Sequence, residues 1–191
     1  MIINHYLISG ILSIVLYLIF HKNKNLKYIY RVLTVLLLLN LLTFNTCLLL
    51  TDTFDHKIHL PLHLCYLTEL GILISIIFKN QFFYPWLLLN SLGGGVTGFL
   101  NSNLGHNSMI IEHIHLYLSH FNLLLFSIIL YKSKFFISKP AFLKSTILNI
   151  LIFSLVVFFN MTFDSNYWFT NNKPPGLNLT SILPEWPYYL I

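Results

Sequence analysis

The chain has 191 residues, of which 56% are hydrophobic and only 9% are charged. Soluble domains carry roughly 25% charged residues, so this composition excludes an ordinary water-soluble protein and predicts an integral membrane protein. The net charge of +5 is divided among short, separate segments, which argues against nucleic acid as a partner. We expect a single integral membrane domain over residues 1–191.

Six apolar runs approach the length of roughly 20 residues that a membrane-spanning helix needs. They cover residues 2–20, 33–50, 60–78, 82–100, 114–131 and 142–163. The predicted fold class is therefore all-α, a polytopic transmembrane helical bundle with six spans. The first run lacks a preceding basic segment and a small-residue cleavage site, so we expect it to be retained. Residues 184–191, PEWPYYLI, are expected to form an interfacial anchor or a truncated seventh helix.

Most of the basic residues lie in alternate connections between these runs. They are Lys22, Lys24, Lys27, Arg31, Lys79, Lys132, Lys134, Lys139 and Lys144. By the positive-inside rule these connections face the cytoplasm, and the N-terminus lies outside. The sequence thus predicts a multi-pass protein of the plasma membrane with membrane lipids as its partners. It does not indicate an oligomeric state.

Two segments allow two interpretations each. The fourth run contains Gly93, Gly94, Gly95 and Gly98, which indicate either close helix packing or local unwinding around a ligand. Residues 164–183 follow the sixth run and contain helix-breaking prolines, so they form either a lid over the outer end of the bundle or an exposed connector.

Polar and ionisable side chains gather at the predicted outer ends of the runs. Ionisable groups inside a membrane are costly, so such a cluster favours a functional site. The stretch HLPLHLCYLTEL, residues 59–70, combines histidines with a cysteine and a glutamate at the start of the third run. Seven of the nine histidines lie at or near outer ends: His56, His59, His63, His106, His113, His115 and His120.

Cys65 in the third run and His120 in the fifth are the candidate catalytic pair. From the rise of a helix, we expect Cys65 about 7 Å and His120 about 10 Å inside the starts of their helices. Two helices then bring a thiol and an imidazole to a similar depth, as a Cys–His nucleophile requires. Cys65 and Glu69 share a helix face, and so do His113 and His120.

Three other accounts of the cluster remain open. A buried cysteine is often only a small apolar residue, and a histidine often only hydrogen-bonds between helices. Histidine, cysteine and glutamate are competent zinc ligands, but the spacing lacks a paired Cys/His zinc pattern, so we predict no metal and no cofactor. A Cys47–Cys65 disulfide would remove the nucleophile, and it needs Cα atoms within about 7 Å.

The stretch LPLHLCYL at residues 60–67 resembles a motif of the YwaF-like integral membrane proteins of bacteria, whose eukaryotic relative is transmembrane protein 164. The segment SNYWFTNNKPPGLNLTSILPEWPYYLI at residues 165–191 is similar to the ending of that family, and the resemblance extends over residues 60–191. It implies a helical bundle and, from the eukaryotic branch, a lipid acyltransferase. Cys65 would be its nucleophile and His120 its base.

We therefore expect a lipid acyltransferase or a related lipid hydrolase with an outward-facing Cys/His site. The expected supporting residues are His63, Thr68, Glu69, His113, Asn166 and Tyr167. Thr68, Glu69 or Asn166 would orient the imidazole, and the Tyr167 hydroxyl would stabilise an oxyanion. The alternative is a transporter or a solute- or cation-binding membrane protein, although the inner halves of the runs hold few polar residues besides Ser75 and Asn149.

Overall fold

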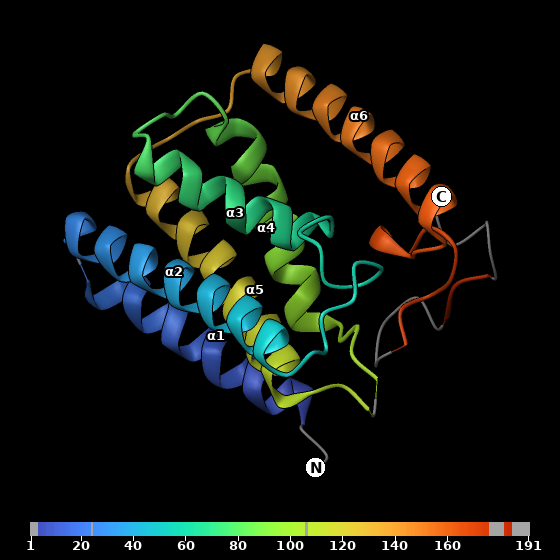
Figure 1. The fold of residues 1–191 in the computed structure, drawn as a ribbon. Coiled ribbons are helices and arrows are strands. Elements are labelled where there is room, and N and C mark those ends of the chain that lie inside the picture. The colour runs from blue at the N-terminus through green and yellow to red at the C-terminus, as the bar shows by residue number, and fades with distance from the viewer. Residues whose placement is uncertain (1–3, 24, 106, 176–181, 185–191) are drawn as a thin grey trace.

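The structure is a computed structural model that describes residues 4–23, 25–105, 107–175 and 182–184. It contains six α-helices and one short 3-10 helix (Figure 1). The elements are α1 His5–Lys22, α2 Leu26–Leu50, α3 Leu64–Ile77, α4 Tyr84–Leu100, α5 Ile110–Lys132, α6 Lys139–Phe163 and η1 Tyr167–Phe169. The all-α prediction is confirmed for the described residues, whereas residues 185–191 of the expected anchor lie outside them.

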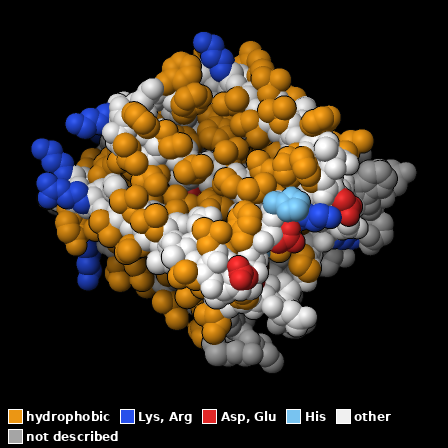
Figure 2. Space-filling model, in the orientation of Figure 1, with side chains coloured by type: hydrophobic (Ala, Val, Ile, Leu, Met, Phe, Trp, Pro, Cys, Tyr) orange, Lys and Arg blue, Asp and Glu red, His pale blue; other side chains and the backbone are white. Residues whose placement is uncertain are grey.

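Four helices are long and apolar enough to cross a membrane, namely α1, α2, α5 and α6. Helix α3 has 14 residues and is shorter than a full span. The surface of α6 is apolar and would be unfavourable in water. Its residues Leu155, Phe158 and Met161 are each more than two-thirds exposed. Figure 2 shows hydrophobic side chains over most of the face in view, as expected for a surface in contact with lipid.

Helix α2 begins earlier than the apolar run predicted. The run starts at residue 33, but the helix begins at Leu26, because the Asn25 side chain caps it by accepting a hydrogen bond from the Tyr28 N–H. Lys27 and Arg31 are therefore helical. Hydropathy marks the apolar length of a helix and does not detect a cap that adds polar turns in front of it.

Helix α3 begins later than predicted. Residues 60–63 form turns, and the helix starts at Leu64. Pro61 accounts for the exclusion of Leu60, because proline disfavours a helical conformation for the residue before it. Cys65 thus lies in the first turn of α3, and the expected depth of about 7 Å inside the helix was wrong.

Helix α5 is the centre of the bundle and packs against α1, α2, α3 and α4. In the most apolar 18-residue stretch of α5, 67% of the residues are buried, whereas the figure for the corresponding stretch of α6 is 11%. Helix α6 packs against α4 and η1. Figure 1 shows α6 standing apart from the other five helices. The side chains that meet around α5 are therefore the ones best shielded from the surroundings.

Glycines bring α4 and α5 together. A Cβ atom on Gly95 would lie 2.6 Å from Leu124 Cγ, and a Cβ atom on Gly98 would overlap the His120 ring. Helix α4 is continuous from Tyr84 to Leu100, so the described structure contains no local unwinding there. The close-packing interpretation is therefore confirmed for Gly94, Gly95 and Gly98, whereas Gly93 has no described neighbour within 4 Å of an added Cβ atom.

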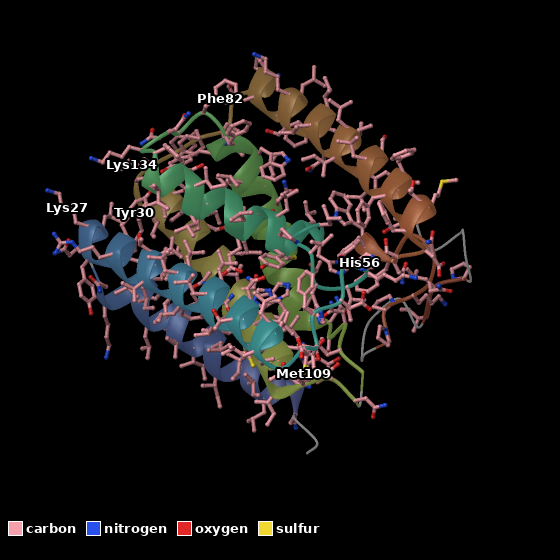
Figure 3. The ribbon with its side chains drawn as sticks, in the orientation of Figure 1. Lys27, Tyr30, His56, Phe82, Met109 and Lys134 are labelled. Atoms are coloured by element: carbon pink, nitrogen blue, oxygen red, sulfur yellow. The ribbon has the colours of Figure 1, made fainter. Side chains whose placement is uncertain are left out.

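The connections between helices separate into two ends. Figure 3 places Lys27 and Lys134 at one end of the bundle and His56 and Met109 at the other. We call these the basic end and the cavity end. The basic connections, which alternate along the sequence, thus lie at one end of the molecule.

Candidate functional site

A cavity of about 320 Å³ opens at the cavity end. Its walls come from α2, from the turns before α3 and the first turn of α3, from the connection between α4 and α5, from the first half of α5 and from the segment after α6. Four of the predicted site residues line it: His63, Cys65, His120 and Asn166. Most of the exposed lining is apolar, with polar groups distributed among it.

Cys65 reaches this cavity from the first turn of α3. Its sulfur lies against α4, because a Cβ atom on Gly94 would be 2.8 Å from Sγ. The side chain is partly buried. Cys65 and Cys47 are both free thiols, so the structure does not contain the disulfide that the sequence left open.

His120 reaches the same cavity from α5 and is 7% exposed. Its Nδ1 lies 2.6 Å from the Leu116 carbonyl oxygen. Because a carbonyl oxygen only accepts, this contact assigns the hydrogen to Nδ1 and leaves a lone pair on Nε2. The ring lies against Gly98, one turn after the Gly94 that contacts Cys65. The thiol and the imidazole therefore pack on neighbouring turns of one α4 face.

The segment after α6 holds the turn before Cys65 in place. The Tyr167 hydroxyl donates to the His56 carbonyl at 2.7 Å and accepts from the Leu60 N–H at 2.9 Å. Burial raises the pKa of Tyr167 to about 12, so the hydroxyl keeps its proton. The Trp168 indole donates to the Leu62 carbonyl at 2.7 Å. Tyr167 thus acts on the backbone that carries the site.

The same segment closes one side of the cavity. Asn166 and Phe169 line it, and the His63 ring lies 5.0 Å from the Tyr167 ring and 5.2 Å from that of Phe169. Trp168 and Phe169 have φ values of 58° and 55°, which are uncommon for bulky residues and mark local strain. The described part of residues 164–183 is therefore more than an exposed connector.

Four predicted supporting residues do not line the cavity: Tyr167, which holds the turn before Cys65, and Thr68, Glu69 and His113. Glu69 is fully buried, where it accepts hydrogen bonds from the side chains of Asn40 and Asn122. Thr68 donates to the Leu64 carbonyl of its own helix at 2.6 Å. His113 has a buried Nδ1 without a partner in the described part of the chain. The His120 imidazole is oriented by the Leu116 carbonyl and not by these side chains.

The cavity also contains residues to which the sequence assigned no role. Glu112, His115 and Ser119 line it from α5, and their spacing of three and four residues forms a polar stripe that could have been recognised. His59 accepts a hydrogen bond from the Asp55 N–H at Nδ1 and places Nε2 3.7 Å from Glu112 Oε1.

His115 and Phe44 form another wall of the cavity, with their rings stacked 3.9 Å apart. No sequence pattern links Phe44 in α2 to this histidine in α5. Among the described residues no group of three or more His, Cys, Asp or Glu side chains is arranged to hold a metal ion. His106 lies outside the described residues.

Comparison with known proteins gives one match. No curated protein and no solved structure matches the chain. The model of the TMEM164 family matches residues 1–191, which extends beyond the 60–191 over which motifs were recognised. With four helices long and apolar enough to cross a membrane and this match over its full length, the chain is a multi-pass membrane protein that belongs to the TMEM164 family.

Proposed function

We propose that this protein is a membrane-embedded lipid acyltransferase that uses Cys65 as its nucleophile and His120 as its general base. The observation that carries the proposal is the shared cavity: the Cys65 thiol and the His120 ring both line it, and the Leu116 carbonyl leaves His120 Nε2 free to accept a proton. A Cys–His pair needs this combination of access and tautomer.

The reaction would proceed in two halves. His120 Nε2 takes the thiol proton, and the thiolate attacks the carbonyl carbon of a lipid ester. The ester C–O bond breaks, the acyl group stays on sulfur as a thioester, and the imidazolium returns its proton to the departing lysolipid oxygen. In the second half His120 deprotonates the hydroxyl of an acceptor lysolipid, which attacks the thioester. The C–S bond breaks, and the imidazolium returns its proton to the departing Cys65 thiolate. Water in place of that acceptor would make the protein a lipid hydrolase.

The composition of the cavity supports a lipid substrate. Phe44, Tyr66 and Leu116 form apolar walls near Cys65, whereas Lys57 and Glu112 add charged groups to the lining. An ester lies between the apolar chains and the polar headgroup of a phospholipid, so a mixed cavity suits it. Membrane lipids would be the partners of the protein.

The proposed setting follows from the basic connections. We propose that all six helices cross the plasma membrane of a bacterial member of the YwaF-like branch, with the basic end in the cytoplasm and the N-terminus outside. The cavity would then open toward the outer leaflet. The orientation can be tested by replacing the exposed Asp52 with cysteine and treating intact cells with a membrane-impermeant maleimide. We expect this cysteine to be labelled, and its protection from the reagent would contradict the orientation.

The decisive experiment examines the covalent intermediate. Purified protein in phospholipid vesicles is treated with acid to trap thioesters, and peptides containing Cys65 are analysed by mass spectrometry. We expect a hydroxylamine-sensitive acyl group on Cys65 in the wild type, none in Cys65→Ala, and full retention in Cys47→Ala. Equal changes in acyl-chain profile on expression of wild type and Cys65→Ala would reject the proposal.

The transporter alternative predicts a different outcome for the same variant. A carrier should bind its solute near the middle of the membrane at interrupted helices, but α4, the glycine-rich helix, is continuous. Proton-coupled solute uptake that survives Cys65→Ala, without any acyl group on Cys65 of the wild type, would favour the carrier.

A further inference from the structure

Glu69 lies one turn after Cys65 on α3 and is fully buried. Two asparagine side chains from other helices bond to its carboxylate. Asn40 of α2 donates at 2.9 and 3.1 Å to the two oxygens, and Asn122 of α5 donates at 2.8 Å to one of them. These neighbours are both neutral.

No cation accompanies this carboxylate in the described part of the chain. The carboxylates that lie within 4 Å of a basic side chain there are Asp55 beside His56, Asp164 beside Lys57 and Glu112 beside His59. A buried charge without a counterion is costly in a protein interior and more so within a membrane. The hydrogen bonds from two amides offset part of that cost, and binding of a proton would remove it.

The two asparagines suit a protonated carboxyl as well as a carboxylate. Among the described residues the Oδ1 atoms of Asn40 and Asn122 are buried and accept no hydrogen bond. Rotation of either amide by half a turn replaces its N–H donor with that oxygen, which can then accept a hydrogen bond from a Glu69 O–H. The site therefore accommodates both protonation states without repacking of the helices.

We propose that Glu69 is a proton-binding site that controls the reactivity of Cys65. With the proton bound, Glu69 is neutral and a thiolate forms one turn away without repulsion. With the proton lost, two negative charges would face each other in an apolar interior, so the thiol stays protonated. The only bond made or broken at Glu69 is its O–H bond. Glu69 thus acts on the charge of Cys65 through space and does not touch substrate.

This inference rests on the proposed function in one respect, because it takes Cys65 as the reactive group. The other titratable groups that line the same cavity as the thiol are Lys57, His59 and His63 before α3, Tyr66 on α3, and Glu112, His115 and His120 on α5. Helix α4 contributes Gly94. Helix α2 faces Glu69 with the neutral Asn40. A comparison of two proteins that differ only at Glu69 keeps all of these groups constant.

The test measures alkylation of Cys65 by iodoacetamide and needs no acyl donor. Rates are determined by mass spectrometry from about pH 5 to about pH 9 in a Cys47→Ser background, for Glu69 and for Glu69→Gln. Glutamine reproduces the neutral carboxyl. We expect equal rates at the acidic end and a wild-type rate that falls behind that of Glu69→Gln at the alkaline end, on the order of tenfold. Asp52→Asn, a change at an exposed carboxyl, should match the wild type at every pH.

Three results would overturn the inference. Equal rates at every pH would mean that Glu69 exerts no control. A constant deficit of the wild type would mean that Glu69 never binds the proton, and an unreactive Cys65 in both proteins would leave nothing to control. Absence of an acyl-enzyme together with the expected pH-dependent divergence would reject the acyltransferase and leave the proton site standing.

A second measurement uses the wild type alone, in case Glu69→Gln does not fold. Infrared spectroscopy at neutral pH should detect the carbonyl stretch of a protonated carboxylic acid, and this band should disappear on titration to alkaline pH. Its absence at neutral pH would also overturn the inference.

Discussion

The cavity end and the basic end of the bundle differ in how their buried polar groups are paired. Toward the basic end, Asn149 of α6 accepts hydrogen bonds from the Trp86 indole at 2.6 Å and from the Asn90 amide at 3.1 Å, and donates to Asn90 Oδ1 at 3.0 Å. At the cavity end, His59 Nε2, His115 Nδ1 and the Ser119 hydroxyl are buried and make no hydrogen bond to the described residues.

The two cavities show the same contrast. A second cavity of about 340 Å³ lies between α1, α4 and α5, where apolar residues such as Leu16, Leu88 and Leu124 dominate its lining. Its Ser127 hydroxyl donates to the Leu123 carbonyl at 3.0 Å, so this hydroxyl already has a hydrogen-bond partner within the protein. The paired groups toward the basic end join helices to one another, whereas the unpaired groups of His59, His115 and Ser119 belong to residues that line the first cavity and are available to a ligand there.

The largest expected effect comes from His120→Asn. The shorter amide can still donate to the Leu116 carbonyl, but it has no group that accepts the thiol proton. We expect acyl transfer to fall by about 100- to 10,000-fold, with little change in melting temperature. Rates of thioester formation on Cys65 provide the measurement, with His21→Asn, an exposed histidine in the last turn of α1, as the matched control. Wild-type rates in His120→Asn would remove the proposed base.

A smaller effect is expected from Gly98→Ala compared with Gly93→Ala. A Cβ atom at residue 98 would overlap the His120 ring, whereas none of the described heavy atoms lies within 4 Å of one at residue 93. We expect Gly98→Ala to displace the ring, to cost about 1–3 kcal/mol of stability and to reduce transfer at least about tenfold. Gly93→Ala should retain activity and gain up to about 1 kcal/mol. Equal activities of the two variants would show that the close contact has no role in catalysis.

The smallest effect on activity is expected from Asn149→Leu, which breaks the paired network toward the basic end. Loss of the amide leaves the Trp86 indole and Asn90 without their α6 partner, at a cost of about 1–3 kcal/mol. The melting temperature should fall while the transfer rate per folded molecule stays unchanged. Thr146→Val, an exposed change one turn earlier on α6, should alter stability by less than about 0.5 kcal/mol. A drop in the rate per folded molecule would contradict the division between the two ends.

Much of the fold could be predicted because hydropathy is a local property. Six apolar runs became six helices, and the basic connections between them gather at one end of the bundle. The errors lie at helix starts, where single residues matter: the Asn25 cap extends α2, and Pro61 keeps Leu60 out of α3. Such local switches have little effect on a hydropathy average.

The candidate site was predicted in part. The sequence by itself determined that polar groups gather at one end of an apolar bundle, because their positions within the runs can be counted. Only the tertiary structure decided that Cys65 and His120 share a cavity. It also decided that Glu69 accepts hydrogen bonds from Asn40 and Asn122 and does not line that cavity. The physical reason is that helix rotation and tilt are set by packing, here by glycines of α4 against α3 and α5. No spacing within a single helix encodes which side chains from another helix will meet it.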